Sequence, residues 1–158
     1  MTSLQHGQPA QATGTHGEQQ VRAVIEDRSR AIEERDADRL VGHHAPAVVV
    51  FDLAPPLRRP PAEVLDPGSH RAWFATFEPG MEYDTSDLAV TVDGDLAVAH
   101  GLVRMSATPK GSAEGFTMWF RATLCLHRTG GTWLITHEHV STPFHMDGSF
   151  RAAVDLVP

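Results

Sequence analysis

The second half of the chain contains four successive segments with the alternating hydrophobicity of β-strands. Residues 81–92 and 96–108 flank Asp93-Gly94, a dipeptide typical of tight hairpins. A longer loop leads to residues 116–128, and Gly130-Gly131 leads to a last segment within residues 130–144. Because these strands follow a helical first half, the sequence predicts an α+β fold rather than alternating βαβ units.

The first half predicts a long amphipathic helix that begins at Glu18. Its apolar residues, from Val21 to Ile32, recur at spacings of three, four and seven. Arg28 lies on the same stripe, so its side chain either extends to solvent or meets a buried anion. Of these two alternatives, we expect the extension to solvent.

Two shorter helices are expected after the first one. Asp36 can cap a helix that runs through Leu40 to residue 44. Asp66-Pro67 begins another, which carries Trp73 and Phe74 and is stopped by Pro79-Gly80. The aromatic residues of this helix are expected either in the core or at one end of a cavity.

Length and charge limit the organisation and the partners of the chain. Its 158 residues are enough for one domain, expected at 18–158 after a disordered tail at 1–17. The formal charge of −7 argues against nucleic acid and anionic membranes as partners. The lone Cys125 excludes an intrachain disulfide. No signal peptide or membrane span is evident in the sequence, so a cytoplasmic location is expected.

The last predicted strand carries two histidines, which are candidate site residues. Simple alternation places Trp133, Ile135, His137 and His139 on one face, which would be apolar at one end and basic at the other. Such a strand is expected in the wall of a ligand pocket, in a metal site or at a polar rim. His100, on an earlier strand, could be a third imidazole ligand. The residues alone leave these alternatives open.

Asp52 is the most suggestive carboxylate in the sequence. It ends the β-branched strand at 47–51 and precedes the proline-rich stretch at 54–61. A carboxylate at the end of a buried strand, before a rigid loop, is well placed for a catalytic base. It is equally well placed to cap a turn, and spacing does not separate the two roles.

The order of these elements resembles the nuclear transport factor 2-like superfamily. Two stretches are similar to its SnoaL-like branch, which includes ketosteroid isomerase-related proteins: residues 119–123 (WFRAT) and the block W-x-I-x-H-E-H-x-S-x-P-F at 133–144. The resemblance covers residue 18 to the C-terminus. It implies a cone, in which a curved antiparallel sheet wraps around the N-terminal helices and leaves a pocket at the open end.

The resemblance also bears on the chemistry. Asp52 falls where ketosteroid isomerase carries its general base, in the same strand-to-loop setting. The oxyanion tyrosine of that enzyme would fall at Arg28, and the single tyrosine of this chain, Tyr83, lies on a predicted strand. The expected function is therefore not steroid isomerisation itself. It is an isomerase, polyketide cyclase or dehydratase activity in secondary metabolism, acting on a small hydrophobic or polyketide-like substrate.

The candidate site combines both lines of reasoning. Asp52 is the expected base, and the other expected catalytic groups, which would polarise or orient the substrate, are His100, Arg121, His137 and His139. The expected substrate-binding residues are Arg28, Trp73, Phe74 and Trp119. No cofactor or metal is expected, and the chain is expected to form a homodimer. Two alternatives remain: a non-catalytic ligand-binding or association module in which Arg28 pairs with Asp52, and a histidine-ligated metal enzyme.

Overall fold

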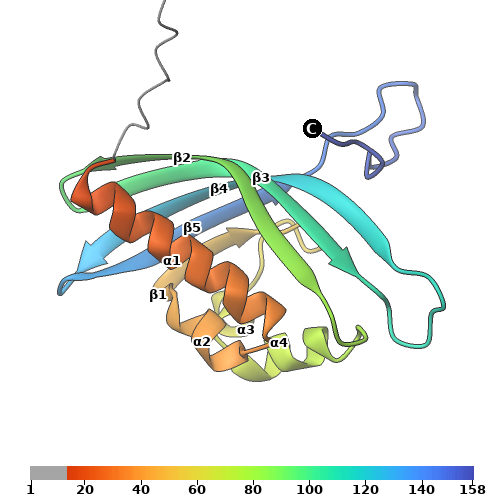
Figure 1. Ribbon diagram of the computed structural model, residues 1–158, viewed down its shortest axis with the longest axis horizontal. Coiled ribbons are helices and arrows are strands. Elements are labelled where there is room, and N and C mark those ends of the chain that lie inside the picture. Colours follow the sequence, from red (N-terminus) through yellow and green to blue (C-terminus); the bar gives the residue numbers. More distant parts are fainter. Residues whose placement is uncertain (1–13) are drawn as a thin grey trace, which may run out of the picture.

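The computed structural model describes residues 14–158, in which four helices precede or accompany a five-stranded sheet (Figure 1). The helices are α1 (His16–Glu33), α2 (Ala37–Gly42), α3 (Pro61–Val64) and α4 (Pro67–Phe74). The strands are β1 (His44–Phe51), β2 (Glu82–Asp93), β3 (Leu96–Ala107), β4 (Phe116–Thr129) and β5 (Thr132–Ser141). The expected α+β class is confirmed.

The helix ends follow local chemistry. The Thr15 hydroxyl accepts a hydrogen bond from the Glu18 N–H, and the Glu18 carboxylate accepts one from the Thr15 N–H. This capping box starts α1 at His16, two residues before the expected start. Asp36 and Asp66 cap α2 and α4, as expected. Most of the expected N-terminal tail, residues 1–13, lies outside the described residues.

The sheet is mixed, with strand order β1-β5-β4-β3-β2. The four long strands pair antiparallel in sequence order, as expected. Strand β1 then joins the free edge of β5 in parallel, which the sequence pattern did not indicate. The sheet curves around α1, which packs mainly against β2, while α2, α3 and α4 lie at one end of the curve (Figure 1). None of these described helices has both the length and the hydropathy needed to span a membrane.

A bulge in β5 changes which residues face the helices. Leu126 pairs with Ile135 but the preceding Cys125 pairs with His137, so Thr136 is an extra residue in β5. The alternation of buried and exposed residues reverses at this point, because Ile135 and Glu138 are both buried although they are three positions apart. The expectation that His137 and His139 share a face with Trp133 and Ile135 is therefore wrong, because a one-residue shift exchanges the two faces of a strand.

A second irregularity lies in β2, where the register shifts between Ser86 and Ala89 and Asp87 has a φ of 50°. Beyond it, Val90 and Val92 are partly buried and pack against the core. Gly101 of β3 lies directly against this bulge. A Cβ atom at Gly101 would lie 2.8 Å from the Ser86 carbonyl oxygen and 3.3 Å from the Leu88 Cα.

We predict that Gly101→Ala lowers the free energy of unfolding by about 1–3 kcal/mol, because the added methyl group meets backbone that cannot rotate away. Gly42→Ala is the matched control, since a Cβ at this exposed helical position has no neighbour within 4 Å. Urea denaturation of both variants measures the difference. Equal stability of Gly101→Ala and wild type would show that the bulge yields without cost.

Candidate functional site

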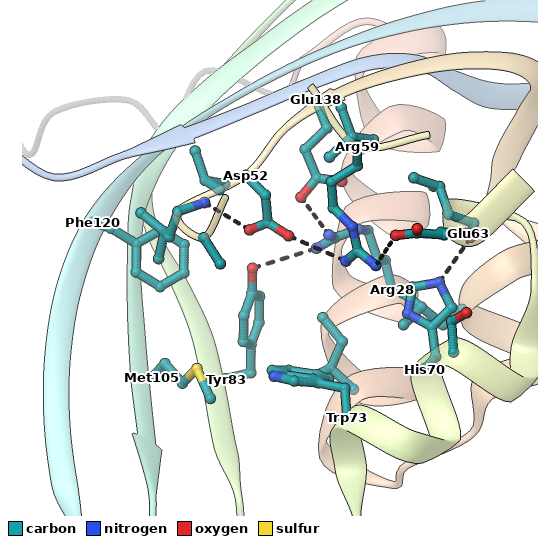
Figure 2. A pocket seen from close by; sticks show the side chains of 18 of the residues that line it. Arg28, Asp52, Arg59, Glu63, His70, Trp73, Tyr83, Met105, Phe120 and Glu138 are labelled. Atoms are coloured by element: carbon teal, nitrogen blue, oxygen red, sulfur yellow. Dashed lines mark hydrogen bonds and ion pairs between the residues drawn. The ribbon is translucent and has the colours of Figure 1, made fainter. Parts of the chain in front are cut away.

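A cavity of about 490 Å³ lies between the curved sheet and the helices (Figure 2). This volume is in the range of small-molecule sites in proteins. Its walls are mostly apolar, and the apolar side chains belong to Ile32, Leu40, Val50, Leu53, Ala54, Pro55, Val64, Trp73, Met105, Phe116, Met118, Phe120 and Val140. The polar lining residues are Arg28, His44, Asp52, Arg59, Glu63, Ser69, His70, Tyr83 and Glu138.

One polar feature of the cavity is a buried ion pair between Arg28 of α1 and Glu138 of β5. The guanidinium Nη2 lies 2.5 Å from Glu138 Oε1, and the two side chains are only 12% and 8% exposed. The expectation that Arg28 extends to solvent is wrong, because the β5 bulge turns Glu138 inward beneath it.

The surroundings of this pair set its charge state. Burial acts to raise the pKa of Glu138, but Arg28 and His44 outweigh burial and hold that pKa well below its ordinary value. His44 Nε2 lies 3.6 Å from Glu138 Oε2, which is an electrostatic contact rather than a close hydrogen bond. Burial likewise acts to lower the pKa of Arg28, but Glu138 and Tyr83 outweigh burial and raise that pKa overall, so the pair stays ionised.

Asp52 lies in the cavity wall one residue after the end of β1. Its Oδ1 accepts a hydrogen bond from the Leu53 N–H at 2.7 Å, and its Oδ2 accepts one from Arg59 Nη1 at 3.2 Å. Arg59 Nη2 also lies 3.7 Å from Oε2 of Glu63, a residue of α3. The arginine that meets Asp52 is thus Arg59 from the proline-rich loop, and not Arg28 as the binding-module alternative predicted.

Tyr83 of β2 is a cavity residue that the sequence reasoning did not include. Its Oη accepts a hydrogen bond from Arg28 Nη1 at 3.5 Å, and its ring is almost completely buried. The only sequence signal was its uniqueness, because a tyrosine on a strand face gives no indication of what lies opposite. His70 of α4 also lines the cavity, and its Nε2 lies 2.7 Å from the Val64 carbonyl oxygen.

The structure brings together three of the predicted site residues: Asp52, Arg28 and Trp73 all line the cavity. Phe74, also expected to bind substrate, is instead 3% exposed in the core, because successive residues of a helix point in different directions.

The other five predicted site residues lie on the outer face of the sheet. None of them is among the described residues that line the cavity. They occupy positions that alternate with the buried ones, or that follow the β5 bulge: His100, Trp119, Arg121, His137 and His139. The expectation that these side chains face the pocket opposite Asp52 is therefore wrong. The strand alternation was correct for β3 and β4, but it did not say which face is concave.

On the outer face of the sheet, residues of three neighbouring strands pair in a row. His139 pairs with Thr123 of β4, which in turn pairs with His100 of β3. Within residues 14–158, no group of three or more His, Cys, Asp or Glu side chains is arranged to hold a metal ion. Val98 and Leu96 are exposed beside His100, at 46% and 61%. The homodimer expected through this face stays a prediction.

Comparison with known proteins places this geometry in a family. The family model described as the SnoaL-like domain matches residues 21–145. The chain belongs to the SnoaL-like family. The match includes α1 from Val21 onward, the whole sheet and every polar residue of the cavity, so the SnoaL-like domain contains the complete candidate site. A search of curated proteins gives no match.

Solved structures support the same fold. The SnoaL-like chain is 29% identical to an NTF2-like protein of unknown function from Pseudomonas putida KT2440, with a TM-score of 0.78 over 92% of this chain and 99% of that one. It is 15% identical to a ketosteroid isomerase-like protein from Erwinia carotovora atroseptica, with a TM-score of 0.67 over 81% and 97%. A Streptomyces avermitilis protein whose name suggests a dehydratase is 21% identical, with a TM-score of 0.69 over 82% and 97%.

We predict that Glu138→Gln lowers the free energy of unfolding by about 3–5 kcal/mol at neutral pH, because it leaves the Arg28 charge buried without its counter-ion. The double variant Arg28→Met/Glu138→Leu is expected to recover most of this loss, since it removes both charges. Urea denaturation measures the three proteins. A loss below about 1 kcal/mol in Glu138→Gln would contradict a buried, ionised pair.

The pH dependence provides the control. Because the pKa of Glu138 is lowered in the folded state, its stabilising contribution is present above the ordinary carboxyl pKa of 4.5 and is lost as the pH falls through the lower folded value. The advantage of wild type over Glu138→Gln should therefore shrink in that acid range and stay constant above it.

Proposed function

We propose that this SnoaL-like protein is a cofactor-independent enzyme that transfers protons on a small hydrophobic substrate, with Asp52 as the general base. The observation that carries the proposal is a carboxylate in the wall of a 490 Å³ cavity whose remaining walls are mostly apolar. A base in such surroundings meets substrate with little competing water, and positioned general bases contribute about 10²–10⁴-fold to a rate.

The environment of Asp52 suits this role. Its backbone partner, the Leu53 N–H, fixes Oδ1, so the carboxylate has a defined direction. Its other oxygen contacts a partly exposed arginine on the proline-rich loop, at 3.2 Å. A substrate that enters the cavity can displace this arginine without uncovering a buried charge, because Arg59 also has Glu63 within reach. Asp52 can then take a proton from a carbon next to a carbonyl group.

The class of reaction follows from this chemistry. Removal of such a proton produces an enolate, which leads to isomerisation, ring closure or loss of water without a cofactor. The apolar walls, with Trp73, Met105 and Phe120 among them, favour a ring system or a polyketide-like chain. The names of the similar structures, which mention isomerase-like and dehydratase-like proteins, are consistent with this range and do not select within it.

One observation favours the alternative of a binding module. The ion pair between Asp52 and Arg59 would be a sufficient reason for Asp52 to be present without catalysis. That alternative, however, also predicted a contact from Asp52 to Arg28, and Arg28 contacts Glu138 instead.

We predict that the protein catalyses exchange of the acidic protons of 2-tetralone with D2O, and that Asp52→Asn slows this exchange by at least about 100-fold. The ketone has an activated carbon beside its carbonyl group and two fused rings that suit the cavity. Proton NMR measures the exchange, and thermal unfolding checks that the variant folds. An Asp52→Asn variant as fast as wild type would reject Asp52 as the base.

We also predict that the cavity binds uncharged ligands better than anions. Three carboxylates, Asp52, Glu63 and Glu138, face two guanidiniums there, which leaves an excess of one negative charge. At neutral pH, 2-naphthol should bind at least about tenfold more tightly than 2-naphthoate, a difference of about 1.4 kcal/mol. Isothermal titration calorimetry measures both.

The matched control for ligand charge is Glu63→Gln, which removes one of the three carboxylates and should reduce the preference. Tighter binding of 2-naphthoate than of 2-naphthol by wild type would mean that the arginines, and not the carboxylates, dominate the field in the cavity.

A further inference from the structure

His70 of α4 is a cavity residue that the proposed general-base chemistry does not use. Figure 2 shows its ring on the helical side of the cavity, and the dashed line that leaves the ring marks its bond to Val64. In this bond, Nε2 of the ring lies 2.7 Å from the Val64 carbonyl oxygen. Because a backbone carbonyl oxygen can only accept a hydrogen bond, Nε2 carries a hydrogen and donates it.

Two helices hold the His70 ring in this position. The Asp66 carboxylate caps α4 by accepting hydrogen bonds from the Gly68 and Ser69 N–H groups, at 2.9 and 3.0 Å, which fixes the turn that carries His70. Val64 is the last residue of α3, and the final carbonyl groups of a helix have no partner within it. The ring is thus attached to α4 through its backbone and to α3 through Nε2, so its orientation is defined.

The surroundings of His70 keep its ring neutral. Burial lowers the pKa of the imidazole below its ordinary value of 6.5, and the bond to the Val64 carbonyl oxygen opposes burial without cancelling it. The nearby His44, Arg59 and Arg28 act in the same direction as burial. At neutral pH the ring therefore carries one hydrogen, and that hydrogen is on Nε2.

The second ring nitrogen of His70, Nδ1, is consequently a hydrogen-bond acceptor. Within residues 14–158, the only recorded hydrogen bond of the ring is the one to Val64. The described side chains contain three polar atoms that are fully enclosed and have no partner, namely Arg28 Nε, His43 Nε2 and His44 Nδ1. The Nδ1 atom of His70 is not enclosed in this way, so a ligand in the cavity can reach it.

This acceptor differs in kind from the carboxylates of the cavity. Asp52, Glu63 and Glu138 are charged, and each of them faces an arginine. The His70 Nδ1 atom is a neutral acceptor in a cavity with mostly apolar walls, where a polar group without a partner is costly. A ligand hydroxyl group satisfies it by donating its hydrogen. A ketone or ether oxygen cannot, because such an oxygen only accepts.

We propose that His70 is a specificity-determining residue: its Nδ1 accepts a hydrogen bond from a hydroxyl group of the ligand. The preferred ligand is then an apolar ring system that carries at least one hydroxyl group. This assignment rests on the proposed function only in adding the hydroxyl group to a substrate that also has a carbonyl group for Asp52 to act beside. The selection of a hydroxyl group is a property of binding, and it does not require turnover.

A purely structural role for His70 makes a different prediction. If the ring served only to satisfy the last carbonyl group of α3, its replacement would change the stability of the protein and the binding of all ligands alike. A ligand that can donate to Nδ1 and one that cannot would then be affected equally. The ratio of the two affinities separates the roles, because a site that pairs with a hydroxyl group discriminates against analogues that lack its hydrogen.

The test compares 2-naphthol with 2-methoxynaphthalene, in which a methyl group replaces the hydroxyl hydrogen, by isothermal titration calorimetry. Wild type should bind 2-naphthol at least about fivefold more tightly, and His70→Gln should reduce this preference to below about twofold. The glutamine amide can still donate to Val64, but it leaves no acceptor at the position of Nδ1. His70→Leu is the second variant. Ser69→Ala is the matched control, since its hydroxyl group already donates to Asp66.

The outcomes are distinct from those of the exchange experiment. A preference for 2-naphthol that is lost in the His70 variants and kept in Ser69→Ala supports the assignment. Absence of exchange with 2-tetralone would reject Asp52 as the base and leave that preference unaffected. Equal binding of the two ligands by wild type, failure of both to bind, or a preference that persists in His70→Gln would overturn the role of His70. The last result would place the hydroxyl group on a carboxylate.

Discussion

The buried ion pair of Arg28 and Glu138 is the interaction on which the arrangement of the cavity depends. It joins α1 to β5, and through Tyr83 and His44 it extends to β2 and β1. Two opposite charges this close in a largely water-free interior attract strongly, but their desolvation consumes much of that attraction. The pair therefore contributes more to the unique geometry of the site than to net stability. Either charge alone would be costly in the packed state, because it would be buried without a counter-ion.

The chain divides its polar residues between two separate environments. The inner set surrounds a cavity with apolar walls, where carboxylates, guanidiniums and one phenol have fixed partners. The outer set is a row of imidazoles and hydroxyls on the convex face of the sheet, open to solvent or to another protein. The histidine motif that most resembles the SnoaL-like branch belongs mainly to the outer set. Similarity in sequence there reflects the family, whereas the proposed chemistry uses residues of the inner set.

Much of the fold could be predicted from the sequence, because hairpin dipeptides, capping aspartates and strand alternation are local signals. Asp52 could be singled out for the same reason, since a strand end before a proline-rich loop is visible in one segment. The contact between Arg28 and Glu138 could not be located from one segment, because the two residues are 110 positions apart in the chain. Thr136 is the clearest example of what the sequence does not predict. This one extra residue in β5 turns Glu138 toward the cavity and His139 toward the outer face of the sheet, and no local sequence pattern indicates the bulge.

The parallel pairing of β1 with β5 has a consequence for how the protein forms. Val49 and His137, which meet across this pairing, are 88 residues apart in the chain. During synthesis, β1, which leads to Asp52, leaves the ribosome well before its neighbour β5. Contacts this far apart in sequence are slow to form, because a long loop must close first. The site can therefore assemble only once β5 is in place to hold the strand that leads to Asp52.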